Sequence, residues 1–345
     1  ITCRDWSSDV CSSDLVLTLL FSKLIFPKKI NKTIFILATS LFFLIFVLLN
    51  YILQNFLPEN MIYPVSLKKG DSVWTITSKN GIKTLALFAP VTFPAEPMED
   101  GKLLCGFGTP DIAGTNGLWF RFSTLYEKNI STETGGWKSG LKKVGSNWKG
   151  TITGPKNLIF GEEKEKLKFL ISTETSFEKL KNLQNRLAEI SKKPYLESDL
   201  DIRKNGNKIS VKIGEISQEL TLEDWSDWYT IPFKLSPIIT INGLAKVKVL
   251  SIEPLELYMT PVQFHPYHIP VNVSISSPQN FARDIAKKNG IFATLGWPEA
   301  TNPLKDGEID ENSCWEDIEN IRKKQEEIYF SHLEKKDWKD RKSVV

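Results

Sequence analysis

Cysteine and histidine are scarce in this sequence, which holds four cysteines and three histidines among 345 residues. Cys3 and Cys11 stand among the first 15 residues, so only Cys105 and Cys314 stand in the rest of the chain. Two cysteines are too few to indicate the redox compartment in which the protein works. Cys105 lies within an apolar run, which predicts a buried and unreactive thiol.

The three histidines do not predict a metal site. His265 and His268 form an H-x-x-H pair, and prolines at 266 and 270 place that pair in a loop. On a helix face the two rings would converge on one zinc ion, but a loop gives no such convergence. No aspartate or glutamate stands close by as a third ligand. His332 stands in a polar, helix-forming stretch, and we expect its side chain to be exposed.

A strong charge of one sign is also missing, because 44 Lys and Arg oppose 41 Asp and Glu, for a net charge of +3. A charge this small does not indicate a nucleic-acid partner. A phosphate-binding P-loop is missing as well. Residues 106–111 (GFGTPD) are rich in glycine, but no Lys-Ser/Thr follows them, and Pro110 has no N–H to donate.

Both ends of the chain resemble translated sequencing adapter. The stretches concerned are residues 4–15 (RDWSSDVCSSDL) and 340–345 (DRKSVV). We set residues 1–15 and 340–345 aside as adapter-like artefact, since foreign segments carry no information on a fold. The natural sequence is expected to run from about residue 16 to about residue 339, as an internal fragment of a longer protein.

One long apolar run predicts a membrane span. Residues 33–53 carry no charge and would extend about 31 Å as a helix, which is enough to cross a bilayer. Residues 16–26 are apolar except for Lys23 and look like the end of an earlier span. We therefore predict a transmembrane helical hairpin over residues 16–56.

The lysines between the two apolar segments predict the orientation of this hairpin. Lys28, Lys29 and Lys32 stand there, and no basic residue follows the second segment before Lys68. The positive-inside rule places the lysine loop in the cytoplasm. The soluble domain is then expected outside the cytoplasm, attached to the membrane.

Residues 57–117 predict part of an α/β domain. A short helix over residues 73–78 is followed by two apolar strands, at 83–89 and 103–105, which are typical of a parallel sheet buried on both faces. Loops at strand ends of such a sheet are where ligands usually bind. Thr109, Asp111 and Thr115 are therefore candidate substrate-binding residues, and the alternative is that they only stabilise a turn.

Residues 118–261 predict a mainly antiparallel, β-rich insertion. Asn205 and Gly206 form a strong hairpin signal between two strands. Asp224 and Asp227 are expected to cap a turn rather than to act as acid and base. A helix with its apolar face on the core is expected over residues 177–190. Further strands are expected at residues 167–171, 229–235, 245–252 and 255–260.

Residues 262–339 return to helices. One helix is expected to begin after Ser277 and Pro278 and to end at Gly290. A long helix is expected from Asp310 to about residue 336. Its apolar side would consist of Trp315, Ile318, Ile321, Ile328 and Leu333.

Several motifs resemble, in their order along the chain, the type I phosphodiesterase branch of the alkaline phosphatase superfamily. Proteins of this branch are described as predicted phosphohydrolases or phosphomutases. The resemblance extends over roughly residues 70–334. The motifs are residues 90–94 (PVTFP), 106–111 (GFGTPD), 114–117 (GTNG) with Thr124, 224–228 (DWSDW), 255–261 (LELYMTP) and 295–299 (LGWPE).

This resemblance implies an α/β fold, with an incomplete alkaline-phosphatase-like sheet, a β-rich insertion and a transmembrane hairpin in front. It implies hydrolysis of phosphate esters through a Ser/Thr phosphoryl-enzyme intermediate. Two divalent metal ions, zinc or manganese, would assist by stabilising the attacking and leaving oxygens. The nucleophile and the metal ligands are expected outside this fragment, so no catalytic residue is assigned in it.

Two other functions stay open. A catalytically inactive relative could act as a membrane-bound binding or scaffold protein. A transferase could move phosphoryl groups on lipid or glycan substrates, which membrane anchoring makes plausible. The expected partners are thus a phosphate-ester small molecule or a lipid- or glycan-linked substrate, together with the membrane.

The orientation of the hairpin predicts the labelling of a single cysteine introduced at Asn60. We expect an impermeant maleimide to label it in intact cells, because the positive-inside rule places it outside the cytoplasm. A cysteine at Asn31, in the lysine loop, should be labelled only after lysis. The opposite pattern at the two positions would reverse the assigned orientation.

Overall fold

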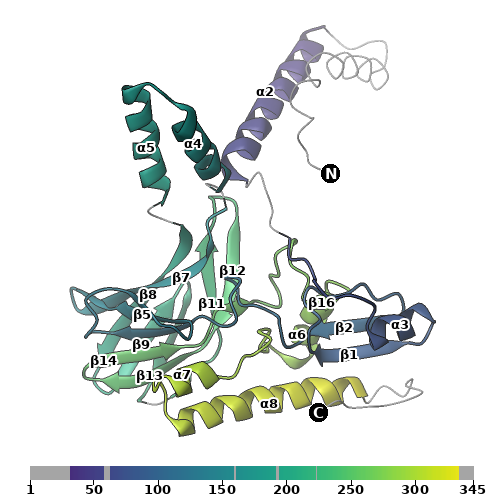
Figure 1. The fold of residues 1–345 in the computed structure, drawn as a ribbon, viewed down its shortest axis with the longest axis vertical. Coiled ribbons are helices and arrows are strands. Elements are labelled where there is room, and N and C mark those ends of the chain that lie inside the picture. The colour runs from purple at the N-terminus through teal and green to yellow at the C-terminus, as the bar shows by residue number, and fades with distance from the viewer. Residues whose placement is uncertain (1–31, 58–62, 159–160, 192–193, 223, 334–345) are drawn as a thin grey trace. The chain divides into compact units, whose positions relative to one another are not determined.

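A computed structural model describes residues 32–57, 63–158, 161–191, 194–222 and 224–333 (Figure 1). The chain divides into two compact units, Ile1–Leu57 and Pro58–Val345. The first unit contains helix α2 (Lys32–Phe56), whose segment Ile36–Leu53 is long and apolar enough to cross a membrane. The expected earlier span at residues 16–26 lies outside the described residues.

The second unit is a mixed α/β structure, and it begins with a small sheet. Helix α3 (Val73–Lys79) leads into strand β1 (Thr84–Ala89), which pairs in parallel with β2 (Gly101–Cys105). Strand β16 (Ser276–Ser277) pairs antiparallel with the other side of β2. The expected helix and parallel strand pair are therefore confirmed.

The expected burial of both strands is only half right. β2 is central in the sheet order β1-β2-β16, and its side chains from Leu103 to Cys105 are buried. β1 lies at the edge of the sheet, so most of its side chains are half-buried. The apolar composition of residues 83–89 predicted burial on both faces, but composition alone does not distinguish an edge strand from a central one.

Three further sheets make up the β-rich part, and most of their pairings are antiparallel, as expected. One has the order β13 (Val247–Ile252), β14 (Leu255–Met259), β3 (Trp119–Ser123), β5 (Gly136–Gly140), β4 (Ile130–Ser131). The second has the order β10 (Ile216–Leu220), β9 (Lys208–Ile213), β8 (Tyr195–Asn205), β7 (Asn147–Lys156), β6 (Lys142–Val144). The third has the order β11 (Tyr229–Lys234), β12 (Thr240–Ala245), β15 (Gln263–Phe264). Strands β3 and β5 are the exception, because they pair in parallel.

The predicted hairpin at Asn205 and Gly206 is confirmed. β8 and β9 pair antiparallel on either side of this turn, and Gly206 has a φ of +63°. This is the left-handed conformation that glycine adopts without a steric cost. The turn therefore follows from local sequence alone.

A helical hairpin interrupts the second sheet between β7 and β8. Helix α4 (Gly161–Thr173) covers residues 167–171, so the expected strand there is wrong. Leu167 is buried and Ile171, one helical turn later, is half-buried. Helix α4 packs on helix α5 (Phe177–Ser191), which supplies the apolar partner that makes a helix stable. The expected helix over 177–190 is thus confirmed, but it packs on α4 and not on the core.

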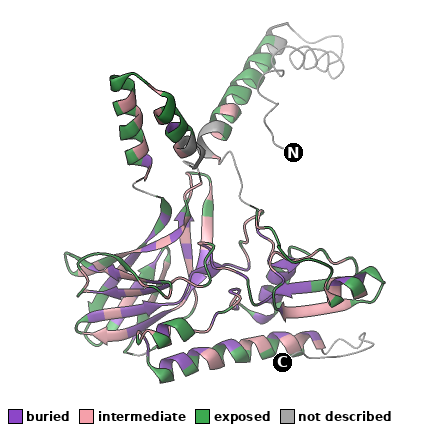
Figure 2. Ribbon diagram, in the orientation of Figure 1, coloured by how far each residue is buried: buried purple, intermediate pink, exposed green. Residues whose placement is uncertain are grey.

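A continuous hydrophobic core joins the β-rich part to the C-terminal helices. It contains Phe120 and Phe122 of β3 together with residues of helix α6 (Phe281–Asn289) and helix α8 (Glu311–Leu333). The short helix α7 (Thr301–Lys305) precedes α8. Figure 2 shows buried residues along the strands and along one side of α8. The β-rich residues 118–261 therefore share their core with helices α6 and α8.

Both C-terminal helices begin close to where the sequence predicts, and α6 also ends there. The expected end of α8 near residue 336 lies outside the described residues. Asp310 stands before α8, and its carboxylate accepts a hydrogen bond from the Ser313 N–H at 2.6 Å. Gly290 ends α6. Trp315 is 64 % exposed, so it does not belong to the apolar side of α8. His332 is buried, not exposed, because α8 packs on α6 and the imidazole ring lies edge-on to Phe281 at 5.8 Å.

The shared core predicts a large effect of Phe120→Ala. Phe120 is buried in it, so its truncation should lower the free energy of unfolding by about 3–5 kcal/mol. Urea unfolding of the detergent-solubilised protein, followed by tryptophan fluorescence, measures this value. Val144→Ala, at an exposed position, should change it by less than about 0.5 kcal/mol. Equal effects of the two substitutions would contradict the shared core.

Candidate functional site

The carboxyl ends of β1 and β2 lead into two loops that hold each other in place. Phe88 and Val91, at the end of β1, have φ values of +51° and +55°. These left-handed conformations are strained for non-glycine residues, above all for a β-branched valine. Val91 donates its N–H to the Phe107 carbonyl at 2.7 Å, and Gly106 donates to the Ala89 carbonyl at 2.8 Å. The strained turn is therefore fixed by the loop after β2.

Asp111 organises the loop after β2. Its carboxylate is buried and accepts hydrogen bonds from the backbone N–H groups of Ala113, Thr115 and Leu118, at 3.0, 2.8 and 2.7 Å, and from the Thr115 hydroxyl. Burial raises the pKa of Asp111, and these four donors oppose the shift. Four donors occupy the acceptor positions of a carboxylate, so Asp111 stabilises the turn.

The other two candidate residues are placed differently. Thr109 is buried and its hydroxyl donates to the Gly106 carbonyl at 2.8 Å. Thr115 is exposed, and its hydroxyl donates to Asp111. The structure thus brings Asp111 and Thr115 together and leaves Thr109 in a separate turn. The geometry of Thr109 and Asp111 favours the alternative that they hold the loop, whereas Thr115 reaches the surface.

Motif segments that are far apart in the sequence meet at this loop. Gly296 donates its N–H to the Thr109 carbonyl at 2.9 Å, and a Cβ atom on Gly296 would lie 2.5 Å from the Gly106 carbonyl oxygen. A Cβ atom on Gly117 would lie 3.5 Å from Pro261 and 3.6 Å from Leu295. Residues 106–117, 261–262 and 295–297 therefore form one contiguous group, which we name the strand-end cluster.

The strand-end cluster carries two exposed aromatic side chains. Phe107 and Trp297 are each about half exposed, and their ring centroids lie 5.6 Å apart. Paired, half-exposed rings offer an apolar surface to an apolar or aromatic part of a ligand. This pair was not predicted from the sequence. The available signal was an aromatic residue next to glycine in each of two motif loops.

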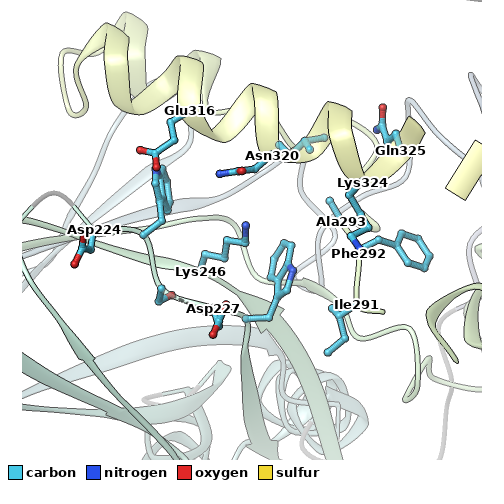
Figure 3. A pocket seen from close by; sticks show the side chains of 14 residues that line it. Asp224, Asp227, Lys246, Ile291, Phe292, Ala293, Glu316, Asn320, Lys324 and Gln325 are labelled. Atoms are coloured by element: carbon cyan, nitrogen blue, oxygen red, sulfur yellow. Dashed lines mark hydrogen bonds between the residues drawn. The ribbon is translucent and has the colours of Figure 1, made fainter. Parts of the chain in front are cut away.

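A pocket of about 420 Å³ lies elsewhere, between α8 and the β-rich part (Figure 3). Residues 224–228 and Lys246 form one wall, residues 291–293 another, and α8 the third. The Lys246 ammonium lies 4.8 Å from the centre of the Trp228 ring, and Figure 3 shows it reaching toward α8. Asp224 accepts a hydrogen bond from the Thr221 N–H at 3.1 Å, so the expected capping role is confirmed for this aspartate.

A buried carboxylate lies beside this pocket. Asp317 on α8 is only 3 % exposed, and one of its oxygens has no hydrogen-bond partner among the described residues. Burial raises its pKa to about 7, and burial also lowers the pKa of Lys246 nearby. The attraction between the two groups opposes both shifts. The other groups whose charges act on Asp317 are Lys248, Glu299 and Glu316.

The described residues contain no group of three or more His, Cys, Asp or Glu side chains that could hold a metal ion. The ring centroids of His265 and His268 lie 4.9 Å apart. Burial lowers the pKa of His265 to about 4, and His268 makes a smaller contribution in the same direction.

Burial raises the pKa of the Cys105 thiol to about 11. This agrees with the expected buried and unreactive cysteine.

Comparisons of the chain with family models, with curated proteins and with solved structures find no match. The function must therefore be argued from the residues and their geometry.

The buried carboxylate predicts a pH-dependent stability that Asp317→Asn removes. The folded pKa of about 7 exceeds the ordinary value of 3.8, so the folded protein binds this proton more tightly than the unfolded chain. The resulting stabilisation of the folded state is on the order of 4 kcal/mol. It is fully present below pH 4 and is lost as the pH rises through 7. Urea unfolding at pH 5 and pH 8 should show this loss, and Asp317→Asn should reduce it.

The matched control is Glu311→Gln, an exposed carboxylate in the first turn of the same helix. This variant should keep the pH dependence of the unmodified protein. If Asp317→Asn also keeps it, another group carries the titration.

Proposed function

We propose that this chain is the central part of a membrane-anchored, metal-dependent phosphohydrolase or phosphodiesterase of the alkaline phosphatase superfamily. In this proposal the protein hydrolyses phosphate esters through a Ser/Thr phosphoryl-enzyme intermediate. Helix α2 anchors it, and the domain after this helix works outside the cytoplasm. The small sheet of β1, β2 and β16 belongs to an alkaline-phosphatase-like sheet, and residues 118–261 form an insertion in it.

The observation that carries the proposal is the meeting of the motifs in the strand-end cluster. Four of the segments that carry the resemblance are 106–111, 114–117, 255–261 and 295–299, and they are separated by up to almost 190 residues in the chain. They touch through the Gly296–Thr109 hydrogen bond and the packing of Gly117 against Pro261 and Leu295. They do so at the carboxyl ends of a parallel strand pair, where α/β proteins bind ligands.

The metal ions have no set of ligands among the described residues. The proposal therefore assigns the two metal ions, zinc or manganese, and the nucleophile to other parts of the protein. When bound, the metals would neutralise charge on the phosphoryl oxygens. What the described residues contribute is the wall of a substrate site, with Phe107 and Trp297 against the ester group and the exposed Thr115 in the loop after β2.

The two alternative functions, a binding or scaffold protein and a transferase, predict different reaction products from the proposed hydrolase. A binding or scaffold relative would retain ligands on the strand-end cluster without turnover. A transferase would release little free phosphate and would label a lipid or glycan acceptor instead. Phosphate release and acceptor labelling, measured side by side, separate the three functions.

The proposal predicts activity for the protein encoded by the uninterrupted gene. It should hydrolyse aryl phosphate mono- or diesters with zinc or manganese and lose activity with a chelator, whereas the present 345-residue chain should be inactive. Trp297→Ala should raise KM roughly tenfold through the lost ring contact. Trp315→Ala removes an exposed tryptophan on α8 and should leave KM unchanged.

Two results would contradict the proposal in different ways. Metal-dependent turnover by the 345-residue chain itself would mean that the active site has been assigned to the wrong residues. Inactivity of the complete protein with every metal and ester tested would favour the binding or scaffold alternative.

A further inference from the structure

The α4–α5 hairpin is an addition that the sheet does not need. Its neighbours β7 and β8 pair antiparallel up to Lys156 and Tyr195, so a two-residue turn would join them. Helices α4 and α5 stand between them instead and pack mainly on each other, and Figure 2 shows them largely exposed. A long, structured connection of this kind usually serves a function of its own.

The apolar residues of the hairpin fall into two groups. Leu180, Leu183 and Leu187 recur at helical spacing on α5 and are half-buried, and α5 packs on α4. We name these three leucines the seam of α5. The residues nearest the turn between the helices are exposed instead. Phe169 is 68 % exposed, Leu170 is 46 % exposed and Phe177 is 82 % exposed. The outer end of the hairpin therefore presents an apolar surface with no partner among the described residues.

Charge is distributed unevenly along the same hairpin. Residues 166–181, around the turn, carry four lysines and two glutamates, namely Lys166, Lys168, Lys179, Lys181, Glu174 and Glu178. Glu174 is partly neutralised by the turn, because it accepts hydrogen bonds from the N–H groups of Thr175 and Ser176. The remaining residues of the two helices, 161–165 and 182–191, carry four glutamates against one lysine and one arginine. Basic charge thus gathers beside the exposed phenylalanines.

Exposed aromatic and aliphatic residues surrounded by lysines are typical of segments that insert into the surface of an anionic membrane. The chain also carries helix α2, whose segment Ile36–Leu53 is long and apolar enough to cross a membrane. Between the end of α2 at Phe56 and the start of α3 at Val73 stand 16 residues, which span at most about 55 Å when fully extended. A tether this short keeps the domain near the bilayer and raises the effective concentration of lipid around it.

We propose that the outer end of the α4–α5 hairpin inserts Phe169, Leu170 and Phe177 into the surface of the membrane that anchors the chain. The neighbouring lysines contact the anionic headgroups. This second attachment fixes the orientation of the domain over the bilayer, which a single covalent connection does not do. The proposal depends on the anchoring by α2 and not on the hydrolase activity, so each can fail without the other.

Depth-dependent fluorescence quenching tests the proposal on the full chain. A single cysteine at Thr175 carries an environment-sensitive dye, and the protein is reconstituted in vesicles of phosphatidylcholine and phosphatidylglycerol and collected by flotation. Lipids with a spin label near the headgroup should quench the dye roughly threefold more than a dye at Asn207, in the exposed β8–β9 turn. The double substitution of Phe169→Ser and Phe177→Ser should abolish this difference.

Phe330→Ser is the matched control, since this phenylalanine is similarly exposed on α8, and it should leave the quenching unchanged. Circular dichroism verifies that the variants stay folded. Weaker quenching in vesicles of phosphatidylcholine alone supports the lysine contact, and equal quenching in both contradicts it. Quenching at position 175 no greater than at 207 overturns the proposal. A blue shift that grows with protein density, without quenching by lipid, overturns it in favour of a second copy of the chain.

Discussion

The structure depends on one hydrophobic core built from segments that are distant in sequence. Phe281, Ile285 and Ile328 pack into the same cluster as the β-rich sheets. Helices α6 and α8 thereby add buried side chains to the core of the β-rich sheets. The strand-end cluster contributes Ile112 and Val262 to this core. Because dispersion and hydrophobic contacts act only at short range, the cluster takes its position from that packing.

The close approach at Gly296 illustrates this dependence. Two backbones can meet there because no side chain intervenes, and the Gly106 carbonyl lies where a Cβ atom would stand. The loop after β2 and the loop before α7 are then held to each other by main-chain contacts. These contacts restrain the strand-end cluster, although it consists of loops.

The elements that the sequence predicts correctly are those with local causes. Gly206 in a left-handed turn, Asp310 as a helix cap and Gly290 as a helix end each act within a few residues of themselves. The errors concern distant partners. Residues 167–171 form a helix because α5 lies against them, and β1 is half-exposed because it pairs on one side only.

The same distinction between local and distant causes applies to the residues of the candidate site. Asp111 could be proposed from its place in a glycine-rich loop, and so could its alternative role in the turn. The pair of Phe107 and Trp297 and the buried Asp317 could not, because each depends on contacts between segments that only the tertiary fold brings together. The helical spacing of the α5 leucines predicted that one face of this helix is buried. The exposed outer end of the α4–α5 hairpin could be recognised only from the structure, which shows that α4 covers that face.

The distance in sequence between the halves of the strand-end cluster has a consequence for the order of folding. Contacts between Thr109 and Gly296 close a loop of nearly two hundred residues, and closing a loop of that length carries an entropy cost that the intervening sheets must first reduce. During synthesis, Gly296 leaves the ribosome only after all of the β-rich strands. We therefore expect this edge of the molecule to assemble after the local strand pairings of the sheets.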